Sequence, residues 1–599
     1  MVDTASSRES RWGSPVVPRR PLGSGDSSSM QSARPPSTSA EPSSASSMTS
    51  LEERATSSWS DVVGTGSAVS CDVVVIGAGI AGLTAAHEIL KRDPTVDLCV
   101  LEAKDRVGGR TFSTEMRVRD GKTETFDLGG QWVGTVQTDI METLTELGLE
   151  VYPQYIKGTK YMQLGGERIR TYRSTIPNLG SWWGLVQLQL FIWKVDRLAR
   201  RCSPLSPCRD KTISKLDGHT ADSFARSHIS NEAALEAIDS ACKVIFGCDS
   251  TRVSLLHFLV DVHAAGGLTP LLEATPGSAQ EFKVKGGTQQ ISKLLAARVG
   301  EQRLLLREPV TRISQEDGTV TVTTGTGRTF HCEYVISSMP PNQLINVEFR
   351  PPLSPDKQQI LRGMPIGHLI KFVVTFEEPF WGSAGFSGEV VTGGGAALVD
   401  GCRSGPLCIV YDATSSTGSA ALVGFIAGSA SVDWQKKTKS DREQAVVTSL
   451  AQFFGNDVKR YIEYQEKVWA EEPYVGGCPV CFAVPGVMRT YSALRQPHGN
   501  VYFCGTELAT RWVGFMSGAV QTGREMAAEV LHVMRPGCLS VADLHLINRR
   551  SSKRADVQSR LRLAVEDDAG DWMWRAAAVT GVAVLLVWVG RRCLEGVLC

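Results

Sequence analysis

Apolar and polar residues first form a regular pattern after residue 70, where two short apolar runs enclose a helical stretch. The first run, at residues 71–76, leads into the glycine-rich segment 77–82, which reads GAGIAG. Residues 83–90 have helical character, and the second apolar run, at 96–101, ends on Glu102. This order predicts a strand–helix–strand unit with a tight turn before the helix.

The spacing of the glycines in this unit matches the dinucleotide-binding fingerprint. Gly77 permits the tight turn, Gly79 lets the backbone approach a pyrophosphate, and Gly82 lets the helix pack closely on the strand. Glu102 follows Gly82 by 20 positions and can accept hydrogen bonds from a ribose. A glycine-rich turn without a ligand is the alternative, but the complete frame favours a bound dinucleotide. Two further residues are expected at this site: Ala78 and Ala103.

A different apolar pattern stands near the C-terminus, where residues 576–589 are uncharged and almost wholly apolar. The flanks carry residues that membrane interfaces favour: Trp572, Trp574, Trp588, Arg591 and Arg592. At about 1.5 Å per residue the segment would form roughly 28 Å of helix, close to one hydrocarbon thickness. The pattern predicts a transmembrane tail anchor at 572–592 after a linker at 536–571. A buried or interfacial helix is the alternative.

Composition indicates a large globular body without a polyanionic partner. The chain has 599 residues, of which 42% are hydrophobic, so it can bury two substantial cores. Because the formal net charge is +0, we expect no nucleic-acid partner. The 15 cysteines are scattered and the histidines lack ligand-like spacing, so we expect free thiols and no metal.

The N-terminal segment, residues 1–70, is rich in Ser and Pro and has almost no apolar periodicity. We expect it to be disordered, because it cannot bury enough surface to offset the entropy of ordering. The chain does not open on an apolar segment, which argues against a secretory signal. Glu9, Asp26 and Glu41 argue against a mitochondrial presequence.

Several later motifs specify which dinucleotide is bound. Residues 106–110 (RVGGR) and 127–132 (DLGGQW) follow the fingerprint, and residues 474–478 (YVGGC), 501–507 (VYFCGTE) and 509–516 (ATRWVGFM) stand near the other end of the chain. In this order the motifs resemble the flavin-containing monoamine oxidase family over about residues 71–533. The resemblance implies FAD, a Rossmann-type α/β fold and oxidation of an amine with reduction of O2 to H2O2.

The resemblance also implies a discontinuous domain arrangement, since motifs that contact one cofactor lie at both ends of the chain. The FAD-binding domain is expected at 71–150, 276–352 and 470–535, and an α+β substrate domain at 151–275 and 353–469. Within the latter, the β-branched run at 372–376 predicts a buried strand.

By resemblance, specific residues take roles at the flavin. Cys478 would be joined to the flavin as a thioether, and Lys371 would reach the flavin edge through a water and assist the reaction with oxygen. Other cofactor contacts implied are Arg110, Gln131, Trp132, Val310, Thr506, Glu507, Phe515 and Met516. The substrate cavity would be lined by Trp132, Leu272, Gln280, Tyr411, Phe425 and Phe515, each of which is otherwise a plain core or loop residue.

Two positions depart from the family, and two others permit another interpretation. The family places two facing tyrosines before the flavin, where this chain has Pro479 and Phe515. Phe515 keeps an aromatic face for an amine and is included with Lys371 and Cys478 as catalytic, whereas Pro479 removes the other wall. The motif Cys478-Pro479-Val480-Cys481 could instead form a disulfide site, or Cys478 a buried thiol. Lys371 could instead reach solvent from a sheet edge.

The sequence therefore predicts a flavin-dependent oxidase of a primary or secondary amine. The alternatives are an oxidase of polyamines or amino acids, for which Glu273 is the one nearby acidic residue, and a flavin-bearing membrane scaffold of weak activity. The expected location is the mitochondrial outer membrane with the body facing the cytosol, and the endoplasmic reticulum is the alternative. A homodimer is left open.

Overall fold

The computed structural model describes residues 68–174, 179–396 and 398–550. The predicted tail anchor at 572–592 and almost all of the N-terminal segment 1–70 lie outside the described residues. Within the described ranges, no helix combines the length and the apolar character that crossing a membrane requires.

The predicted strand–helix–strand unit is present and begins an eight-stranded sheet. Strand β1 (Ala68–Ile76) pairs in parallel with β2 (Leu98–Leu101), and helix α2 (Ile80–Arg92) connects them. The sheet has the order β10-β2-β1-β13-β12-β11-β14, and β20 pairs with β13. Its other strands are β10 (Leu304–Leu305), β11 (Val310–Glu316), β12 (Thr319–Thr324), β13 (Thr329–Ser337), β14 (Glu348–Arg350) and β20 (Val501–Phe503).

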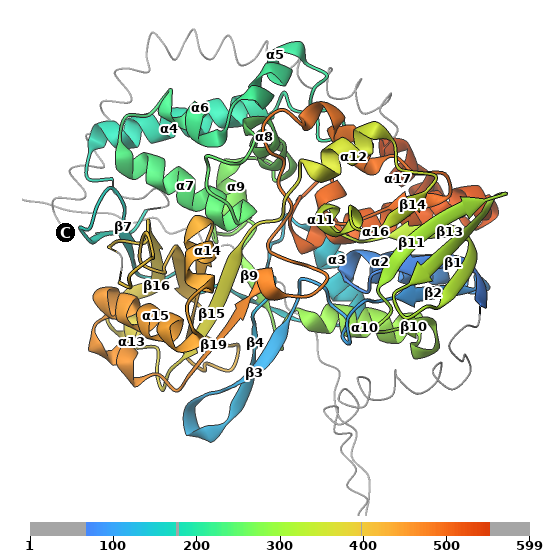
Figure 1. Ribbon diagram of the computed structural model, residues 1–599. Helices are drawn as coiled ribbons and strands as arrows, with labels where there is room; N and C mark the ends of the chain where they lie inside the picture. The colour runs from blue at the N-terminus through green and yellow to red at the C-terminus, as the bar shows by residue number, and fades with distance from the viewer. Residues whose placement is uncertain (1–67, 175–178, 397, 551–599) are drawn as a thin grey trace, which may run out of the picture. The chain divides into compact units, whose positions relative to one another are not determined.

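Segments far apart in sequence thus meet beside β1. Val74 and Val75 of β1 lie opposite Val335 and Ile336 of β13, and all four side chains are fully buried. Figure 1 shows α16 (Met516–Met534) running beside α2, more than 400 positions earlier in the chain. Gly523 permits this close packing, because a Cβ on it would lie 2.5 Å from the carbonyl oxygen of Ala81.

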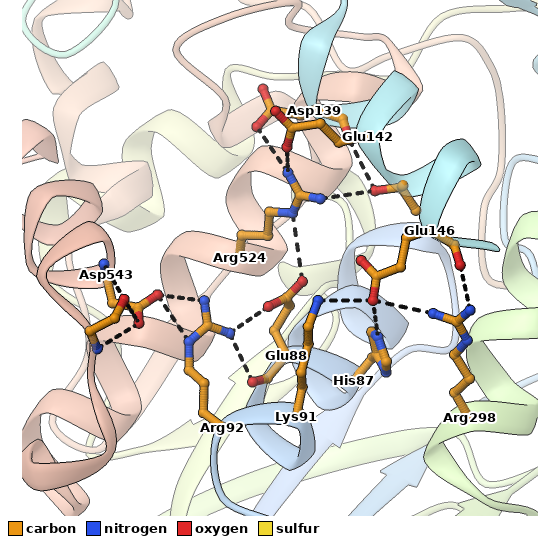
Figure 2. A network of polar contacts seen from close by, with 12 residues as sticks. His87, Glu88, Lys91, Arg92, Asp139, Glu142, Glu146, Arg298, Arg524 and Asp543 are labelled. Carbon is orange, nitrogen blue, oxygen red and sulfur yellow. Dashed lines mark hydrogen bonds and ion pairs between the residues drawn. The ribbon is translucent and has the colours of Figure 1, made fainter. Parts of the chain in front are cut away.

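An ion-pair network joins the helices on this side of the sheet, as Figure 2 shows. Arg92 of α2 contacts Asp543 of α17 (Val541–Arg550) at 2.6 Å. Arg524 of α16 contacts Glu142 of α3 (Thr138–Leu147) at 2.7 Å. Glu146 of α3 lies 3.2 Å from Arg298 of α10 (Gln289–Val299). Linked pairs fix the helices relative to one another more effectively than isolated surface pairs do.

A second, seven-stranded sheet has the order β19-β15-β18-β17-β16-β7-β8. Every residue of β15 (Leu369–Thr375) is buried, which confirms the strand predicted at 372–376. The other strands are β7 (Thr159–Gln163), β8 (Arg170–Tyr172), β16 (Phe386–Thr392), β17 (Ile409–Asp412), β18 (Ala421–Ala427) and β19 (Glu463–Val468). Two small sheets pair β3 (Ser113–Arg117) with β4 (Thr123–Asp127), and β9 (Phe282–Val284) with β5 (Trp132–Val133) and β6 (Val151–Pro153).

The remaining helices come mainly from two stretches of chain. The first stretch holds α4 (Trp182–Ala199), α5 (Lys211–Ser214), α6 (Ala221–Arg226), α7 (Glu232–Phe246), α8 (Leu255–Ala264) and α9 (Leu268–Leu272). The second holds α11 (Pro341–Leu344), α12 (Pro355–Arg362), α13 (Phe380–Ser383), α14 (Ser429–Gln435) and α15 (Lys439–Phe454). The α/β fold class is confirmed, and the division into a cofactor and a substrate domain stays a prediction.

Candidate active site

A cavity of about 750 Å³ extends from the glycine turn to the second sheet and to helices α4, α7 and α9. Most of the residues predicted for the site line it: Gly77, Gly79, Glu102, Ala103, Arg110, Gln131, Trp132, Leu272, Gln280, Val310, Lys371, Tyr411, Phe425, Cys478, Thr506, Phe515 and Met516. The other three predicted residues, Ala78, Gly82 and Glu507, do not line it. One cavity therefore collects residues from nearly the whole length of the described chain.

The glycine turn has the geometry expected for a dinucleotide. Gly77 has φ +96°, which favours glycine, and its N–H donates to the carbonyl oxygen of Leu101 at 2.7 Å. A Cβ on Gly82 would lie 2.0 Å from the Gly77 carbonyl oxygen, so Gly82 is required for packing. A Cβ on Gly79 would meet no described atom nearer than Gly109 Cα at 4.0 Å. The protein thus leaves the space before Gly79 open, as a pyrophosphate requires.

Glu102 stands at the carboxyl end of β2, where the ribose of a dinucleotide is expected. Its carboxylate accepts hydrogen bonds from the N–H of Ala78 at 2.7 Å and of Lys104 at 3.0 Å. Burial raises the pKa of Glu102, although these two N–H groups oppose the shift. The backbone therefore holds the carboxylate at the cavity wall, and the residues present fit FAD.

Arg110 and Glu507 form a bidentate ion pair, with N–O distances of 2.6 and 3.0 Å. Arg110 also donates to the carbonyl oxygen of Pro479 at 2.9 Å, and Glu507 accepts from the N–H of Cys481. Burial acts to raise the pKa of Glu507, but the Arg110 guanidinium outweighs it and holds the pKa below its ordinary value. Arg110 thus orders the segment that carries Cys478, and the cofactor contact expected of it stays a prediction.

Lys371 is buried at the centre of β15, with 2% of its surface exposed. Its ammonium donates to the carbonyl oxygen of Gly129 at 2.8 Å and to Oε1 of Gln131 at 2.9 Å. Burial lowers the pKa of Lys371 to about 8, against the opposing effect of Asp127. The lysine is therefore a cavity residue and does not reach solvent from a sheet edge.

The two cysteines of the Cys478-Pro479-Val480-Cys481 motif have separate surroundings. Cys478 lines the cavity, and burial raises the pKa of its thiol to about 12. Cys481 is fully buried, and its thiol donates to Oδ1 of Asn342 at 3.3 Å. Both are free thiols in the described part of the chain, so the disulfide alternative has no support here.

Aromatic side chains form part of the cavity wall beside Lys371. The ring of Trp132 lies 5.5 Å from that of Tyr411 and 6.1 Å from that of Phe425. The ammonium of Lys371 lies 5.3 Å from the Trp132 ring, and Phe515 packs edge-on against Trp512. Trp132, Tyr411 and Phe425 therefore form an aromatic wall of the cavity.

The sequence did not identify every residue of the cavity. Glu389 of β16 lines it, but Ser387 and Thr392 in the same strand leave no continuous apolar run in which a carboxylate would be conspicuous. Ser338 also lines it and donates to the carbonyl oxygen of Ile76 at 2.8 Å, but no pattern around Ser338 marks it. Over residues 68–174, 179–396 and 398–550, no group of His, Cys, Asp and Glu could hold a metal ion.

Comparison with known proteins identifies this arrangement. The family model for flavin-containing amine oxidoreductases matches residues 80–531. A probable flavin-containing monoamine oxidase A of Dictyostelium discoideum is 33% identical over 77% of this chain and 97% of its own. The human flavin-containing amine oxidase B is 32% identical over 78% of this chain and 86% of its own.

Solved structures of similar fold agree with this match. The cyclohexylamine oxidase of Brevibacterium oxydans has a TM-score of 0.70 and 28% identity, and covers 78% of this chain and 99% of its own. A redesigned putrescine oxidase has a TM-score of 0.71 and 25% identity, and covers 78% of this chain and 100% of its own. The cavity geometry and these matches together show that the chain belongs to the flavin-containing amine oxidoreductase family and is an FAD-dependent amine oxidase.

Proposed function

We propose that this enzyme oxidises a primary or secondary amine to an imine and reduces O2 to H2O2. The observation that supports the proposal is the single cavity that joins the glycine turn to Lys371, Cys478 and an aromatic wall. When bound, FAD accepts two electrons and the α-hydrogen of the amine and is reoxidised by oxygen. The protein supplies binding, orientation and electrostatics.

The chain's own residues divide these tasks. Gly77, Gly79 and the N-terminus of α2 would bind the pyrophosphate, and Glu102 the ribose. Phe515 would present an aromatic face to the amine. The charged Lys371 ammonium, held by Gly129 and Gln131, would assist the reaction with oxygen.

A thioether between Cys478 Sγ and the flavin is part of the proposal. Cys478 is the cysteine of its motif that lines the cavity, whereas Cys481 is held by Asn342. The N–H of Cys478 donates to the carbonyl oxygen of Gly367 at 2.9 Å, which fixes the backbone at the attachment position. A Cβ on Gly477 would lie 2.3 Å from the same oxygen, so a glycine is required before the cysteine.

The identity of the amine is tested by peroxide release from purified holoenzyme across a panel of amines. The relatives are named for monoamines, putrescine and cyclohexylamine, so the panel includes aryl-alkyl, cyclic and aliphatic amines. Peroxide release with any of these supports an oxidase. A bound flavin that no amine bleaches under anaerobic conditions would support the scaffold alternative instead.

We also propose that residues 572–592 anchor the protein in the mitochondrial outer membrane with its body in the cytosol, and the endoplasmic reticulum is the alternative. The support is the apolar run with its tryptophan and arginine flanks. Fractionation of cells expressing the full chain, with carbonate extraction and protease protection, tests the anchor, the organelle and the orientation. Light scattering on detergent-purified protein tests for a homodimer.

A further inference from the structure

Two carboxyl groups line the substrate side of the cavity. Glu273 stands directly after α9, and Glu389 lies in β16. Leu188 and Ile192 of α4 line the same cavity, whose lining includes many apolar side chains. A carboxylate in such a place is costly unless a cation or hydrogen-bond donors compensate it.

Other residues of the protein compensate the negative charge of Glu389. The ammonium of Lys160 lies 2.9 Å from Oε2, and the Tyr172 hydroxyl donates to Oε1 at 3.1 Å. The positive charge of Lys160 is therefore already paired with Glu389. The Glu389 carboxylate therefore requires neither a cation nor a hydrogen-bond donor from a substrate.

Glu273 lacks such compensation. Its side chain is half-buried and lines the cavity. The carboxylate forms no hydrogen bond or ion pair with another residue of the described chain. Burial is the main cause that raises the pKa of Glu273 to about 7; Lys160 opposes the shift, and Glu389 adds to it. Two carboxyl groups thus share one ammonium group, and the ionised Glu273 has one negative charge left without a cation.

Gln280, a neighbour of Glu273, independently indicates that a hydrogen-bond donor is missing from this part of the cavity. Its N–H donates to the carbonyl oxygen of Glu273 at 3.3 Å, so the two residues are neighbours in space. Gln280 lines the cavity and is 8% exposed, yet its side-chain Oε1 accepts no hydrogen bond from the described residues. A buried amide oxygen without a donor is unfavourable, and a ligand N–H group would satisfy it.

Aromatic rings line the cavity between the end that holds Glu273 and Glu389 and the end that holds Lys371. Tyr411 lines the same cavity as Glu389 and Glu273; burial raises the pKa of its phenol, and the charges of these two carboxyl groups add to the shift. Trp132 follows at 5.5 Å from Tyr411 and lies 5.3 Å from the ammonium of Lys371. A molecule with its reacting amine at the Lys371 end can therefore extend along Trp132 and Tyr411 to Glu273.

We propose that Glu273, whose backbone Gln280 contacts in the cavity wall, binds a second ammonium group of the substrate, so that the preferred substrates are aliphatic diamines. This inference rests on the proposed amine oxidation. An ammonium group has three donors, which suffice for the carboxylate of Glu273 and for Oε1 of Gln280. The same charge disfavours substrates with a carboxylate, such as amino acids.

The test compares a monoamine with a diamine of equal carbon number, 1-aminopentane and 1,5-diaminopentane, by peroxide release from the full-length holoenzyme. The wild type should favour the diamine by about 10-fold to 100-fold in kcat/KM, the range of one charge-assisted hydrogen bond. Glu273→Gln should remove this preference by raising the diamine KM, with kcat and the monoamine KM changed about twofold at most. Equal kcat/KM for both substrates in the wild type would overturn the inference.

A matched control separates local binding from long-range attraction. Glu115→Gln removes the same charge from an exposed position outside the cavity and should keep the diamine preference. An equal loss in both variants would overturn the subsite. Gln280→Leu should weaken diamine binding in the same direction as Glu273→Gln.

A binding measurement keeps this inference separable from the proposed function. The α,α,α′,α′-tetramethyl analogue of 1,5-diaminopentane has no α-hydrogen and cannot be oxidised to an imine, yet it keeps its N–H donors. It should raise the thermal midpoint of the wild type more than that of Glu273→Gln. If no amine is turned over, the proposed function fails, and this comparison still decides the subsite. Identical shifts in both proteins would overturn it.

Discussion

Gly79 is the N-cap of α2, and a side chain at this position is expected to collide with the cofactor and not with the protein. Its Cβ would have Gly109 Cα at 4.0 Å as the nearest described atom, and its φ and ψ of −78° and 177° suit any residue. In Gly79→Val the fold should therefore persist. The expected cost to the unfolding free energy is about 1 kcal/mol, because valine is a poorer helix N-cap than glycine.

The loss in FAD binding should be much larger than the loss in stability. Three added carbon atoms would occupy the space where a pyrophosphate meets the N–H groups at the start of α2. Each hydrogen bond to a charged group contributes about 1.5–3 kcal/mol. Losing one or two should weaken FAD binding by about 3 kcal/mol, which is roughly 100-fold.

Gly82→Ala provides the matched control, because there the obstruction lies within the protein. Its Cβ would stand 2.0 Å from the Gly77 carbonyl oxygen and 2.9 Å from Oγ of Ser338. The backbone of β1 or α2 must shift, at a cost of about 1–3 kcal/mol in unfolding free energy. This variant should lose stability and flavin together, whereas Gly79→Val should lose mainly flavin.

The assay is the ratio of flavin to protein absorbance after gel filtration, followed by titration of the flavin-free protein with FAD and by denaturant unfolding. A Gly79→Val protein that purifies folded, with the flavin content and FAD affinity of the wild type, would refute the assignment of this turn to the pyrophosphate. A Gly79→Val protein that does not fold would refute the claim that the space before Gly79 is open.

Three further predictions concern oxygen, the covalent bond and the membrane. Lys371→Met should slow flavin reoxidation by O2 by about 10-fold or more and leave the anaerobic reaction with amine unchanged. In the wild type, flavin reoxidation should slow as pH rises through about 8, because Lys371 loses its charge there. Stopped-flow measurements check both, and an unchanged oxygen rate would contradict the role. Acid-precipitated wild type should keep yellow flavin in the pellet and Cys478→Ala should release it, so free FAD from the wild type would disprove the thioether. Truncation after Gly570 should yield a flavin-bearing protein in the supernatant, and carbonate extraction of the full chain would contradict the anchor.

The elements near the glycine turn were predictable because their signals are local. Gly77 and Gly82 each satisfy a steric requirement that neighbouring residues impose, and both requirements appear in the structure as a positive φ and a 2.0 Å approach. Lys371 was predictable as a buried lysine for a related reason, since the apolar residues around it leave a strand no exposed face.

The partners of these residues were not predictable, because they come from distant parts of the chain. Arg110 pairs with Glu507, 397 positions away, and nothing in the sequence around Arg110 indicates this pair. The hydrogen bond from Cys481 to Asn342 spans 139 positions, and no local pattern distinguishes it from a bond between Cys478 and Cys481. Such pairings are decided by how the sheets and helices meet.

The charges at the two ends of the cavity suit the two forms of a diamine that an oxidase must hold at once. Removing the α-hydrogen and two electrons from an amine requires its neutral form, whereas recognition by a carboxylate requires an ammonium. With a pKa of about 8, Lys371 is mainly charged at neutral pH. Its positive charge disfavours protonation of the reacting amine nearby. Glu273 favours protonation of the other amine for the opposite reason. In the proposed arrangement the cavity therefore orients a symmetric substrate by protonation state, without distinguishing its ends by shape.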